Sequence, residues 1–392
     1  MTSGFGDERV AGLRPFALER FFAKHEFNVR WTLCASDCQT MRITELLDLA
    51  GPESLRLWET ASLGYTQSEG HPRLRELISA GYRQGRPDEV LTVVPVEGIY
   101  LALRALLEPG DEVVVPWPAY QSLAEVALGV GAKVRCWEPD FSKAPTDPEF
   151  FSLETLAELM SPRTKLVVTN FPHNPTGALV SRAQWATLLE MVANHNAWLL
   201  SDEMYRGLEF EPDEARLPAA YESDYRRTVS LCGLSKRHGL PGLRLGWLAT
   251  RDQGLMHRIR CLKDYTTICG VGPGELLGMI GLENEDALTE RSMSFIRNGI
   301  SAWSDVAREF ARYIDWVEPS AGPISFPRLK SDEFDATWLC TKLRDDSEVL
   351  ILPGQVYGDA YRGRFRIAFG RGDAAQAVEA FRHGFAELAA HL

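Results

Sequence analysis

The stretch VSLCGLSKRHGLPGLRLGW, residues 229–247, joins two apolar strand-like runs through a glycine-rich turn. The turn carries Lys236, and Arg244 stands at the start of the second run. A lysine shielded from water loses its proton below its usual pKa near ~10.4 and can then attack a carbonyl. The order is typical of a Schiff-base lysine beside an anion anchor, although a Ser-Lys pair on its own is more often an exposed loop lysine.

Outward from this stretch, short apolar runs alternate with amphipathic helical patterns between residues 90 and 250. The predicted strands are Val90–Val94, Glu112–Pro116, Lys133–Trp137, Lys165–Asn170, Trp198–Ser201, Thr228–Leu231 and Arg244–Ala249. The predicted helices between them include Ile99–Leu107, Tyr120–Val130, Leu153–Met160 and Ala183–Ala193. Strands that are apolar throughout are typical of a sheet covered on both faces. The fold class is therefore predicted to be α/β, with a mostly parallel seven-stranded sheet under helices on both faces.

The length of 392 residues indicates more than one domain, because single hydrophobic cores stop growing near ~250–300 residues. We expect a large domain over residues 56–290. A long helical passage, Pro273–Arg312, crosses into residues 291–392, which hold shorter strands such as Val349–Leu352 after it. We expect them to form a smaller α+β domain together with residues 1–55.

Composition excludes several classes of partner. The chain carries 54 acidic and 42 basic residues and a formal net charge of −12, which argues against nucleic acid or an anionic membrane as the main partner. The seven cysteines include no CxxC pair, so neither a disulfide framework nor a metal site is expected. No charged segment followed by an apolar stretch opens the chain, and no run of ~18 apolar residues occurs. A cytoplasmic enzyme is expected.

Polar side chains follow three of the predicted strands. Asn174 comes after the strand ending at 170, Asp202 ends the strand WLLSD, and Lys236 follows the strand ending at 231. In α/β sheets the ligand binds beyond the carboxyl ends of the strands, so an amide, a carboxylate and an amine are predicted to meet there. A buried carboxylate needs a cationic partner, so Asp202 implies a bound cation such as a protonated pyridine nitrogen. The alternative for Asp202 is a helix N-cap.

Four ordered motifs carry a family resemblance: NPTG (174–177), SDEMYRGL (201–208), LSKRHGLPGLRLGW (234–247) and FRIAFG (365–370). Together they resemble the pyridoxal-phosphate enzymes of fold type I, the class I/II aminotransferase family, over about residues 60–380. The resemblance implies pyridoxal 5′-phosphate as cofactor in the large domain and an α-amino acid as substrate. It also implies a homodimer with active sites at the interface, and no nucleic-acid or membrane partner.

The resemblance assigns roles to the residues at the strand ends. Lys236 would hold the cofactor as an internal aldimine, and after substrate replaces it in an external aldimine it would move the proton that passes through the quinonoid. Asp202 would pair with the pyridinium nitrogen, and Tyr205 and Asn174 would hydrogen-bond the phenolate oxygen. Arg244 would grip the phosphate through its forked guanidinium.

Three more roles follow from the resemblance. Tyr120, in PWPAYQ, matches the aromatic residue that stacks on the cofactor ring, and Arg366 would bind the substrate α-carboxylate with help from Asn174. Tyr65, in LGYTQSEG, matches a tyrosine that reaches the phosphate of the neighbouring subunit. For both tyrosines plain packing is the alternative, because aromatic residues are common in cores.

The sequence departs from the family pattern at the phosphate. The turn after the first strand, usually Gly-Ser or Gly-Ala, contains Pro95, which has no N–H to donate, so one phosphate contact would be absent or supplied by Val96 and Glu97. The position three before the lysine, often a phosphate-binding serine, is Gly233. We therefore expect looser retention of the cofactor. Its anchoring would depend more on two side chains, Ser235 and Arg244.

A second resemblance lies outside these motifs. FFAKHEF (21–27), CASDCQTM (34–41), NFPHNPTG (170–177) and KDYTTICGVGPGELL (263–277) resemble capreomycidine-synthase-like cyclases of arginine-derived amino acids. Such enzymes use the same covalent chemistry for elimination and ring closure, or for β/γ-replacement, in specialised metabolism. Ser36, Asp37 and Thr267 then become candidate substrate-binding residues. The alternative is an ordinary hinge loop at 33–41 and a helix end at 263–268.

Three functions are thus open. The leading one is an aminotransferase-like enzyme, the second an elimination or cyclisation enzyme, and the third a non-catalytic regulator with the same fold. Regulators of this kind carry a basic helix-turn-helix domain, for which residues 1–55 give no indication. His173 and Glu97 are polar residues near the expected ring that would steer the reaction, but the sequence does not decide between amino transfer and elimination.

Overall fold

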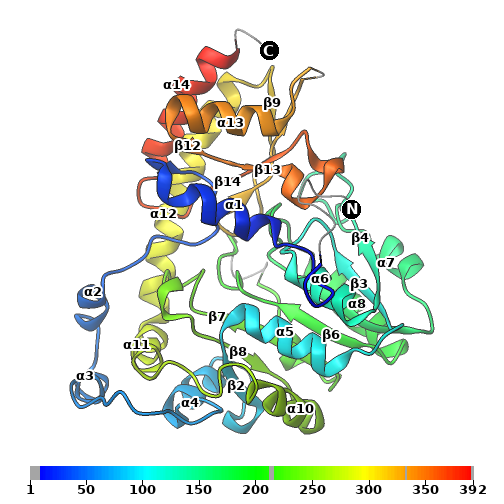
Figure 1. The fold of residues 1–392 in the computed structure, drawn as a ribbon, viewed down its shortest axis with the longest axis vertical. Helices are drawn as coiled ribbons and strands as arrows, with labels where there is room; N and C mark the ends of the chain where they lie inside the picture. Colours follow the sequence, from blue (N-terminus) through cyan, green and yellow to red (C-terminus); the bar gives the residue numbers. More distant parts are fainter. Residues whose placement is uncertain (1–8, 212–215, 332, 390–392) are drawn as a thin grey trace.

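A seven-stranded sheet forms the centre of the large domain in the computed structural model, which describes residues 9–211, 216–331 and 333–389 (Figure 1). The strand order is β2-β8-β7-β6-β5-β3-β4. In that order the strands are Val90–Val93, Gly246–Ala249, Thr228–Gly233, Trp198–Asp202, Thr164–Asn170, Glu112–Pro116 and Lys133–Trp137. Strand β8 runs opposite to the other strands, so it pairs antiparallel with β2 and β7, and all the other pairs are parallel. The predicted α/β class with a mostly parallel sheet is confirmed.

The antiparallel strand has a local cause. The connection from β7 to β8 holds only a 3-10 turn, Pro241–Leu243, and a chain that returns over so short a distance pairs antiparallel. Arg244 was predicted to begin this strand, but it adopts a left-handed conformation with φ 52°. The strand therefore begins at Gly246.

Helices cover both faces of the sheet. Val113 and Val115 belong to one core cluster and Val114, between them on β3, to another, as the alternation of side chains along a strand requires. The first cluster contains side chains of α5, α6 and α10, and the second contains side chains of α7 and α8. These helices are, in that order, Pro95–Leu106, Ser122–Val130, Gln253–Lys263, Leu153–Leu159 and Arg182–Asn194. A further cluster lies under the helices α2 Ile43–Leu47, α4 Pro72–Ala80 and α11 Gly272–Glu283.

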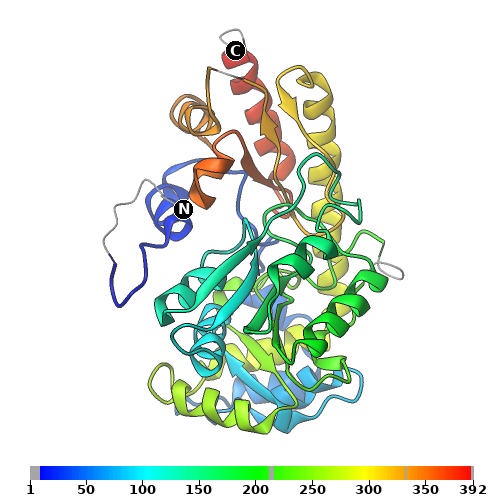
Figure 2. The ribbon, with the colours of Figure 1, turned by 90° about the vertical axis from the view of Figure 1, so that its right-hand side faces the viewer.

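The two ends of the described chain meet in a smaller α+β domain. Strand β1 (Trp31–Thr32) pairs in parallel with β12 (Val349–Leu350), and Leu33 shares a core cluster with C-terminal residues such as Phe381. Figures 1 and 2 show this domain above the sheet, with α1 at the junction of the two domains. Its helices are α1 Ala17–His25, α12 Glu285–Glu309, α13 Ala336–Ser347 and α14 Ala374–Ala389. Its other strands are β9 Ile314–Asp315, β10 Ile324–Ser325, β11 Arg328–Leu329, β13 Leu352–Pro353 and β14 Phe365–Ala368.

Several element boundaries differ from prediction. The single helical passage predicted over Pro273–Arg312 is two helices, because α11 ends at Asn284, whose side-chain amide donates to the Ile280 carbonyl at 2.9 Å. The strand predicted over Val349–Leu352 is divided between β12 and β13, which pair with different partners, β1 and β14.

The expected domain limits fall inside helices. The limit at 55/56 lies in α3 (Pro52–Glu59), and the limit at 290/291 lies in α12, which side chains of both domains contact. Within the described residues, no helix has both the length and the apolar composition needed to cross a lipid bilayer.

Candidate active site

A cavity of about 400 Å³ lies at the carboxyl ends of β5, β6 and β7, below the small domain. Most of the residues predicted for the site line it: Ser36, Asp37, Val96, Tyr120, Asn174, Asp202, Tyr205, Ser235, Lys236, Arg244 and Arg366. The structure thus brings together side chains that are far apart in the sequence, from the loop after β1 to β14.

Lys236 lies just after β7 and projects into this cavity. Its Nζ donates to Ser36 Oγ at 2.9 Å and lies 5.9 Å from the centroid of the Tyr205 ring. Burial lowers the pKa of Lys236, and the nearby Asp37 carboxylate offsets part of this effect. A larger share of the amine is therefore neutral, and so nucleophilic, than for a lysine in water.

Asp202 is the last residue of β6 and is 5% exposed. Its Oδ1 accepts a hydrogen bond from Met204 N at 3.2 Å, and residues 204–207 form a turn, so Asp202 is not the N-cap of a helix starting there. Burial raises the pKa of Asp202 to about 7. No ion pair joins it to another side chain in the described residues. Its carboxylate is thus suited to a cation on a bound ligand.

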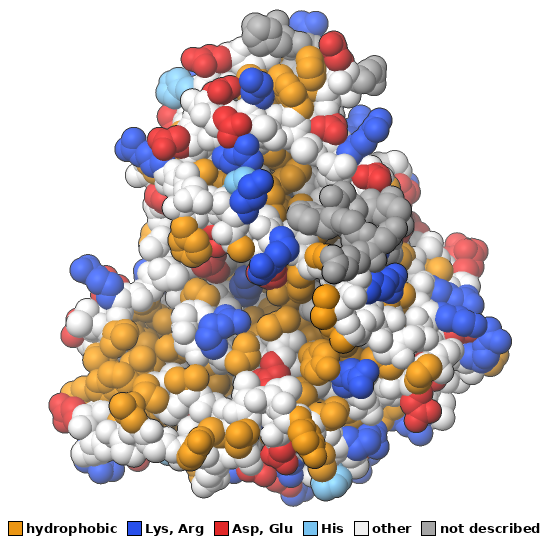
Figure 3. Space-filling model, in the orientation of Figure 1, with side chains coloured by type: hydrophobic (Ala, Val, Ile, Leu, Met, Phe, Trp, Pro, Cys, Tyr) orange, Lys and Arg blue, Asp and Glu red, His pale blue; other side chains and the backbone are white. Residues whose placement is uncertain are grey.

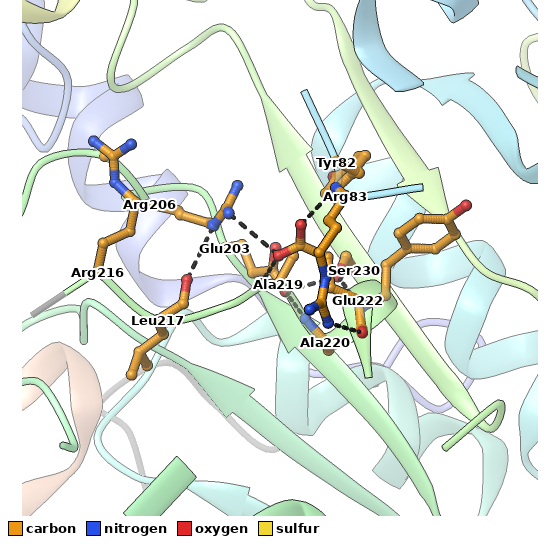
Figure 4. Close-up of polar contacts among 12 residues, drawn as sticks. Tyr82, Arg83, Glu203, Arg206, Arg216, Leu217, Ala219, Ala220, Glu222 and Ser230 are labelled. Atoms are coloured by element: carbon orange, nitrogen blue, oxygen red, sulfur yellow. Dashed lines mark hydrogen bonds and ion pairs between the residues drawn. The ribbon is translucent and has the colours of Figure 1, made fainter. Parts of the chain in front are cut away.

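A second buried carboxylate, Glu203, fixes the turn that carries Asp202. Glu203 Oε1 accepts hydrogen bonds from Ala220 N at 2.8 Å and Ser230 Oγ at 2.7 Å (Figure 4). Arg206 NH2 lies 3.5 Å from Glu222 Oε2 in the same group of contacts. Glu203 was not predicted as part of the site, although it follows Asp202 directly.

Arg366, on β14, reaches the cavity from the small domain and is 1% exposed. Its NH1 donates to Asn174 Oδ1 at 3.1 Å and to Tyr357 Oη at 3.2 Å, and its NH2 donates to the Cys34 carbonyl at 2.9 Å. Its Nε has no hydrogen-bond partner in the described part of the protein. The guanidinium is held rigidly by neutral groups and keeps an unshared positive charge for an anion.

The side chain of Asn170 connects the main chain of Asn174 to the main chain of Asp202. Its Oδ1 accepts from Asn174 N at 3.0 Å, and its Nδ2 donates to the Asp202 carbonyl at 3.2 Å. Asn170 itself lines the cavity and was missed, because it was counted only as a strand end. The ends of β5 and β6 are therefore locked together beneath the site.

Four hydrogen-bond donors lie toward the other end of the cavity. Ser235 Oγ is buried and has no partner among the described residues. The amides of Val96 and Glu97 lie in the first turn of α5, where a helix offers no internal acceptor. Arg244 lines the same end, and its NH1 donates to the Pro241 carbonyl at 3.0 Å. These groups form a site for an anion.

The two departures from the family pattern, Pro95 and Gly233, pack against each other. A Cβ added at Gly233 would lie 3.0 Å from Gly246 Cα and 3.2 Å from Pro95 Cγ. A Cβ at Gly246 would lie 2.8 Å from the same proline ring. Pro95, together with the main chain of Leu245 and Gly246, therefore crowds the space that a serine side chain at position 233 would need.

Three predicted residues do not line this cavity. The Glu97 carboxylate accepts hydrogen bonds from Val94 N at 3.1 Å and from the Thr267 hydroxyl at 2.8 Å, so only its amide remains available. Thr267 lies beyond Glu97, on a separate small pocket. Tyr65 is 92% exposed. His173 is also outside the cavity, buried with Nδ1 2.8 Å from Thr176 Oγ1.

Helix α1 contributes residues that the sequence analysis missed. Leu18, Glu19 and Phe22 line the cavity from one face of the helix, and Glu26, the residue that directly follows the helix, lines it as well. The sequence shows that these residues share a face of the helix, but it does not show that the face points into the cavity. Glu19 Oε1 accepts a hydrogen bond from Tyr120 Oη at 2.8 Å.

The donor set fits one kind of ligand. It offers an anion site, a buried carboxylate for a cation and an amine that can condense with a carbonyl, arranged around a single cavity. The family model for aminotransferase class I and II matches residues 33–383. The chain belongs to the class I and II aminotransferases.

Individual relatives of this aminotransferase-family protein include enzymes of two kinds. Capreomycidine synthase of Streptomyces vinaceus is 34% identical over 357 residues, covering 90% of this chain and 88% of the relative. An aspartate aminotransferase of Rhizobium meliloti is 27% identical over 334 residues, covering 79% and 78%.

The solved structures that resemble this chain also include an aminotransferase and a cyclase. A PLP-dependent aminotransferase from Streptococcus suis 89-1591 superposes with a TM-score of 0.87 at 26% identity and covers 97% of this chain and 98% of that one. The PLP-dependent cyclase OrfR superposes with a TM-score of 0.85 at 25% identity and covers 98% and 99%. The protein is thus a pyridoxal-phosphate-dependent enzyme. The unpartnered Ser235 hydroxyl and the buried Asp202 carboxylate fit the phosphate and the pyridine nitrogen of that cofactor.

Proposed function

We propose that the protein transfers the amino group of an α-amino acid, with Lys236, Asp202 and Arg366 as the central residues of the reaction. The observation that carries this proposal is their convergence on one cavity from β7, β6 and β14. A nucleophilic amine, a cation-binding carboxylate and an anion-binding guanidinium are the groups that this chemistry needs.

Pyridoxal phosphate, when bound, supplies an aldehyde that condenses with amino groups and a ring that withdraws electrons from the substrate Cα. Lys236 Nζ would hold the cofactor and, as a base beside the substrate, would take the proton from its Cα. Asp202 would bind the ring nitrogen and keep it protonated. Tyr205 and Asn174 would hold the phenolate oxygen. Tyr120 would cover the ring.

The other residues orient the two ends of the reacting molecule. Arg366 binds the substrate α-carboxylate through its fork of N–H groups, with Asn174 beside it. Ser235, Arg244 and the amides of Val96 and Glu97 hold the phosphate. Ser36, which accepts from Lys236 Nζ, keeps the amine directed into the cavity.

Elimination followed by cyclisation is the second candidate. It is favoured by the 34% identity to capreomycidine synthase over 90% of the chain, which exceeds the 27% identity to the Rhizobium meliloti aspartate aminotransferase. Both reactions begin with removal of the Cα proton, so the same residues serve them. They differ in whether the proton is then delivered to the cofactor or a β- or γ-substituent leaves.

A single-turnover experiment separates the two reactions. Cofactor-loaded protein is mixed with a panel of amino acids without any keto acid, and the cofactor absorbance and the products are followed. Amino transfer converts one equivalent of cofactor to its pyridoxamine form and releases one equivalent of keto acid. Elimination leaves the cofactor in its yellow form and releases a product that lacks the leaving group. No change with any amino acid would overturn the proposed function.

We also propose a homodimer with shared active sites. Leu63, Tyr65, Tyr265 and Val271 are 92%, 92%, 90% and 60% exposed. Thr66 Oγ1 donates to Glu275 on α11 at 2.8 Å, which joins the loop that carries Tyr65 to the helix after Val271. Figure 3 shows hydrophobic side chains gathered at the lower left, over α3, α4 and α11. Large exposed apolar patches are typical of interfaces, and a second copy of the chain would cover this one.

Mixing two variants tests the shared site. If Tyr65 of one copy serves the phosphate in the other, equal amounts of Tyr65→Ala and Lys236→Ala chains should form heterodimers with one intact site. Random exchange then restores about a quarter of wild-type activity, although each variant alone is impaired. The measurement is activity after refolding the mixture, with sedimentation to give the mass. A monomer, or no recovery of activity, would contradict the shared site.

A cytoplasmic location stays a prediction from sequence.

A further inference from the structure

The carboxylate of Glu97 joins two elements that lie far apart in the sequence. Its Oε2 accepts a hydrogen bond from Val94 N at 3.1 Å, which closes the first turn of α5. Its Oε1 accepts from the Thr267 hydroxyl at 2.8 Å and from the Thr266 hydroxyl. Both threonines lie in residues 264–271, the α10–α11 loop, which connects those two helices. One side chain therefore ties this loop to the first turn of α5.

The first turn of α5 is also the proposed phosphate site. Pro95 has no N–H to donate there, so the main-chain donors that the turn leaves free are the amides of Val96 and Glu97. The direction of these amides depends on the turn that the Glu97 carboxylate closes. Glu97 thus offers its main chain to the phosphate and its side chain to the α10–α11 loop.

The negative charge of Glu97 makes these two contacts depend on each other. A bound phosphate would repel a carboxylate in the same turn, and donors to that carboxylate reduce the repulsion. The donors are the two threonine hydroxyls. Burial lowers the pKa of Lys263, and the nearby charge of Glu97 opposes that effect, while Lys263 Nζ donates to the Ile268 carbonyl at 3.0 Å. A phosphate is therefore bound more favourably when the α10–α11 loop is in place.

The α10–α11 loop is strained and exposed. Ile268 has a φ of 64°, in the left-handed region that disfavours a β-branched residue. Tyr265 and Ile268 are 90% and 53% exposed. The contacts of the two threonine hydroxyls with Glu97 are open to water, where a hydrogen bond contributes less than in a dry environment. The arrangement of the loop therefore depends on what covers it.

A second copy of the chain is the cover that the proposed homodimer supplies. Tyr265 and Val271 belong to the exposed apolar face proposed as the interface. The loop that carries Tyr65, on the same face, is also tied to the segment before α5, because Thr92 N on β2 donates to the Glu69 carbonyl at 3.0 Å. Docking of a second copy would remove water from the hydrogen bonds of the α10–α11 loop and strengthen them.

We infer that Glu97 is a positioning residue that couples cofactor binding to the association of two copies of the chain. A bound phosphate holds the threonine donors more firmly, so the α10–α11 loop presents Tyr265 to a second copy in one arrangement. Association in turn fixes these donors and favours the phosphate, since coupling between two binding events is reciprocal. The inference rests on the proposed phosphate site and the proposed homodimer.

Dimer dissociation constants with and without cofactor test the inference. Fluorescently labelled full-length chain is diluted stepwise after removal of cofactor and again with saturating pyridoxal 5′-phosphate. Where dilution does not separate the dimer, the rate of subunit exchange between two labelled populations gives the same comparison. The wild type is expected to dimerise about a hundredfold more tightly with cofactor, or about tenfold for each of the two sites of a dimer. Equal constants, or a chain that stays monomeric, would overturn the inference.

Variants show whether Glu97 carries the coupling. Glu97→Ala removes both contacts and should reduce the ratio of the two dimer constants to about tenfold or less. Glu97→Gln keeps the hydrogen bonds but not the charge, so its ratio should lie between those of Glu97→Ala and the wild type. Glu290→Ala, at an exposed pair with Arg297, is the matched control and should keep the wild-type ratio. Thermal unfolding shows that each variant is folded. A wild-type ratio in Glu97→Ala would sink the inference.

Two further backgrounds separate Glu97 from other routes. Thr266→Val with Thr267→Val removes both hydroxyls at nearly constant shape. Adding Glu97→Ala to that pair should change the ratio less than about twofold, because the changes break the same contact. Tyr65→Phe removes the hydroxyl proposed to reach the other copy's phosphate, and Glu97→Ala should still lower the ratio in that background. Full additivity with the threonine changes, or no effect of Glu97→Ala beside Tyr65→Phe, would contradict the assigned role.

These measurements need no turnover, so they fail separately from the proposed function. A chain that couples cofactor to association but alters no amino acid would contradict the proposed function alone. A chain that alters amino acids but has equal dimer constants with and without cofactor would contradict the role of Glu97 alone.

Discussion

Lys236→Ala is expected to lower kcat by about 10³-fold or more and to remove the yellow absorbance of covalently held cofactor. The residue combines two tasks at one atom, because its Nζ both attaches the cofactor and moves the Cα proton. Its lowered pKa arises from burial in the cavity, so a lysine elsewhere on the chain cannot replace it. Absorbance spectra after dialysis and single-turnover rates measure the two effects separately.

The control for this variant is Lys342→Ala. Lys342 lies on the exposed side of α13, 3.9 Å from Asp346, and its loss should leave both absorbance and rate unchanged. Reduction of the wild-type protein with borohydride, followed by peptide mapping, should place the cofactor on Lys236. Persistence of the yellow absorbance in Lys236→Ala would show that another residue holds the cofactor.

Asp202→Asn is expected to have opposite effects on activity and on the stability of the cofactor-free protein. Activity should fall by about 10³-fold, because a neutral amide cannot keep the ring nitrogen protonated. The free energy of unfolding of the cofactor-free protein should rise, because the buried charge is removed while the Oδ1 acceptor for Met204 N is retained.

The pH dependence gives the sign of the stability effect. The pKa of Asp202 is raised from 3.8 to about 7 by burial, so the folded protein holds a proton that the unfolded chain has lost. Cofactor-free wild type should therefore lose stability as pH rises from 3.8 to about 7, by an amount on the order of a few kcal/mol. Asp202→Asn should lack this loss, so its advantage is greatest above that range.

Urea unfolding of the cofactor-free proteins at several pH values checks this prediction. Asp305→Asn, at an exposed pair with Arg308, is the control and should follow the wild type at each pH. A cofactor-free Asp202→Asn protein that is less stable than wild type in mildly alkaline solution would show that the carboxylate is already compensated within the fold.

Most of the central sheet was predictable because its signal is local. Runs such as Lys165–Asn170 and Trp198–Ser201 are apolar at successive positions, and β5 and β6 occupy nearly the same residues. The antiparallel direction of β8 was not predicted, since it depends on the geometry of the turn that contains Arg244. The division of α11 from α12 was not predicted either; it falls at Asn284, whose side-chain amide donates to the carbonyls of Ile280 and Leu49.

The site residues, too, include some that local sequence patterns predicted and some that they did not. Residues in ordered motifs, such as Asn174 and Lys236, were predicted and lie in the cavity, but their roles stay predictions. Glu26 and the lining residues of α1 were missed because a helical pattern shows which residues share a face but not what that face packs against. This face reaches the cavity through contacts between the domains, such as that of Phe22 with Arg366, which no local pattern encodes.

Helix α12 is one continuous element of 25 residues that belongs to both hydrophobic cores, with Leu288 in one and Trp303 in the other. At about 1.5 Å per residue, it is a rod nearly 40 Å long. Near its middle, Gly299 packs so closely on Phe369 that an added Cβ would lie 2.7 Å from the Phe369 carbonyl oxygen. Phe369 directly follows β14, the strand that carries Arg366. Because α12 is anchored in both cores and packs against Phe369, it fixes the position of β14, and with it Arg366, relative to the large domain that carries Lys236.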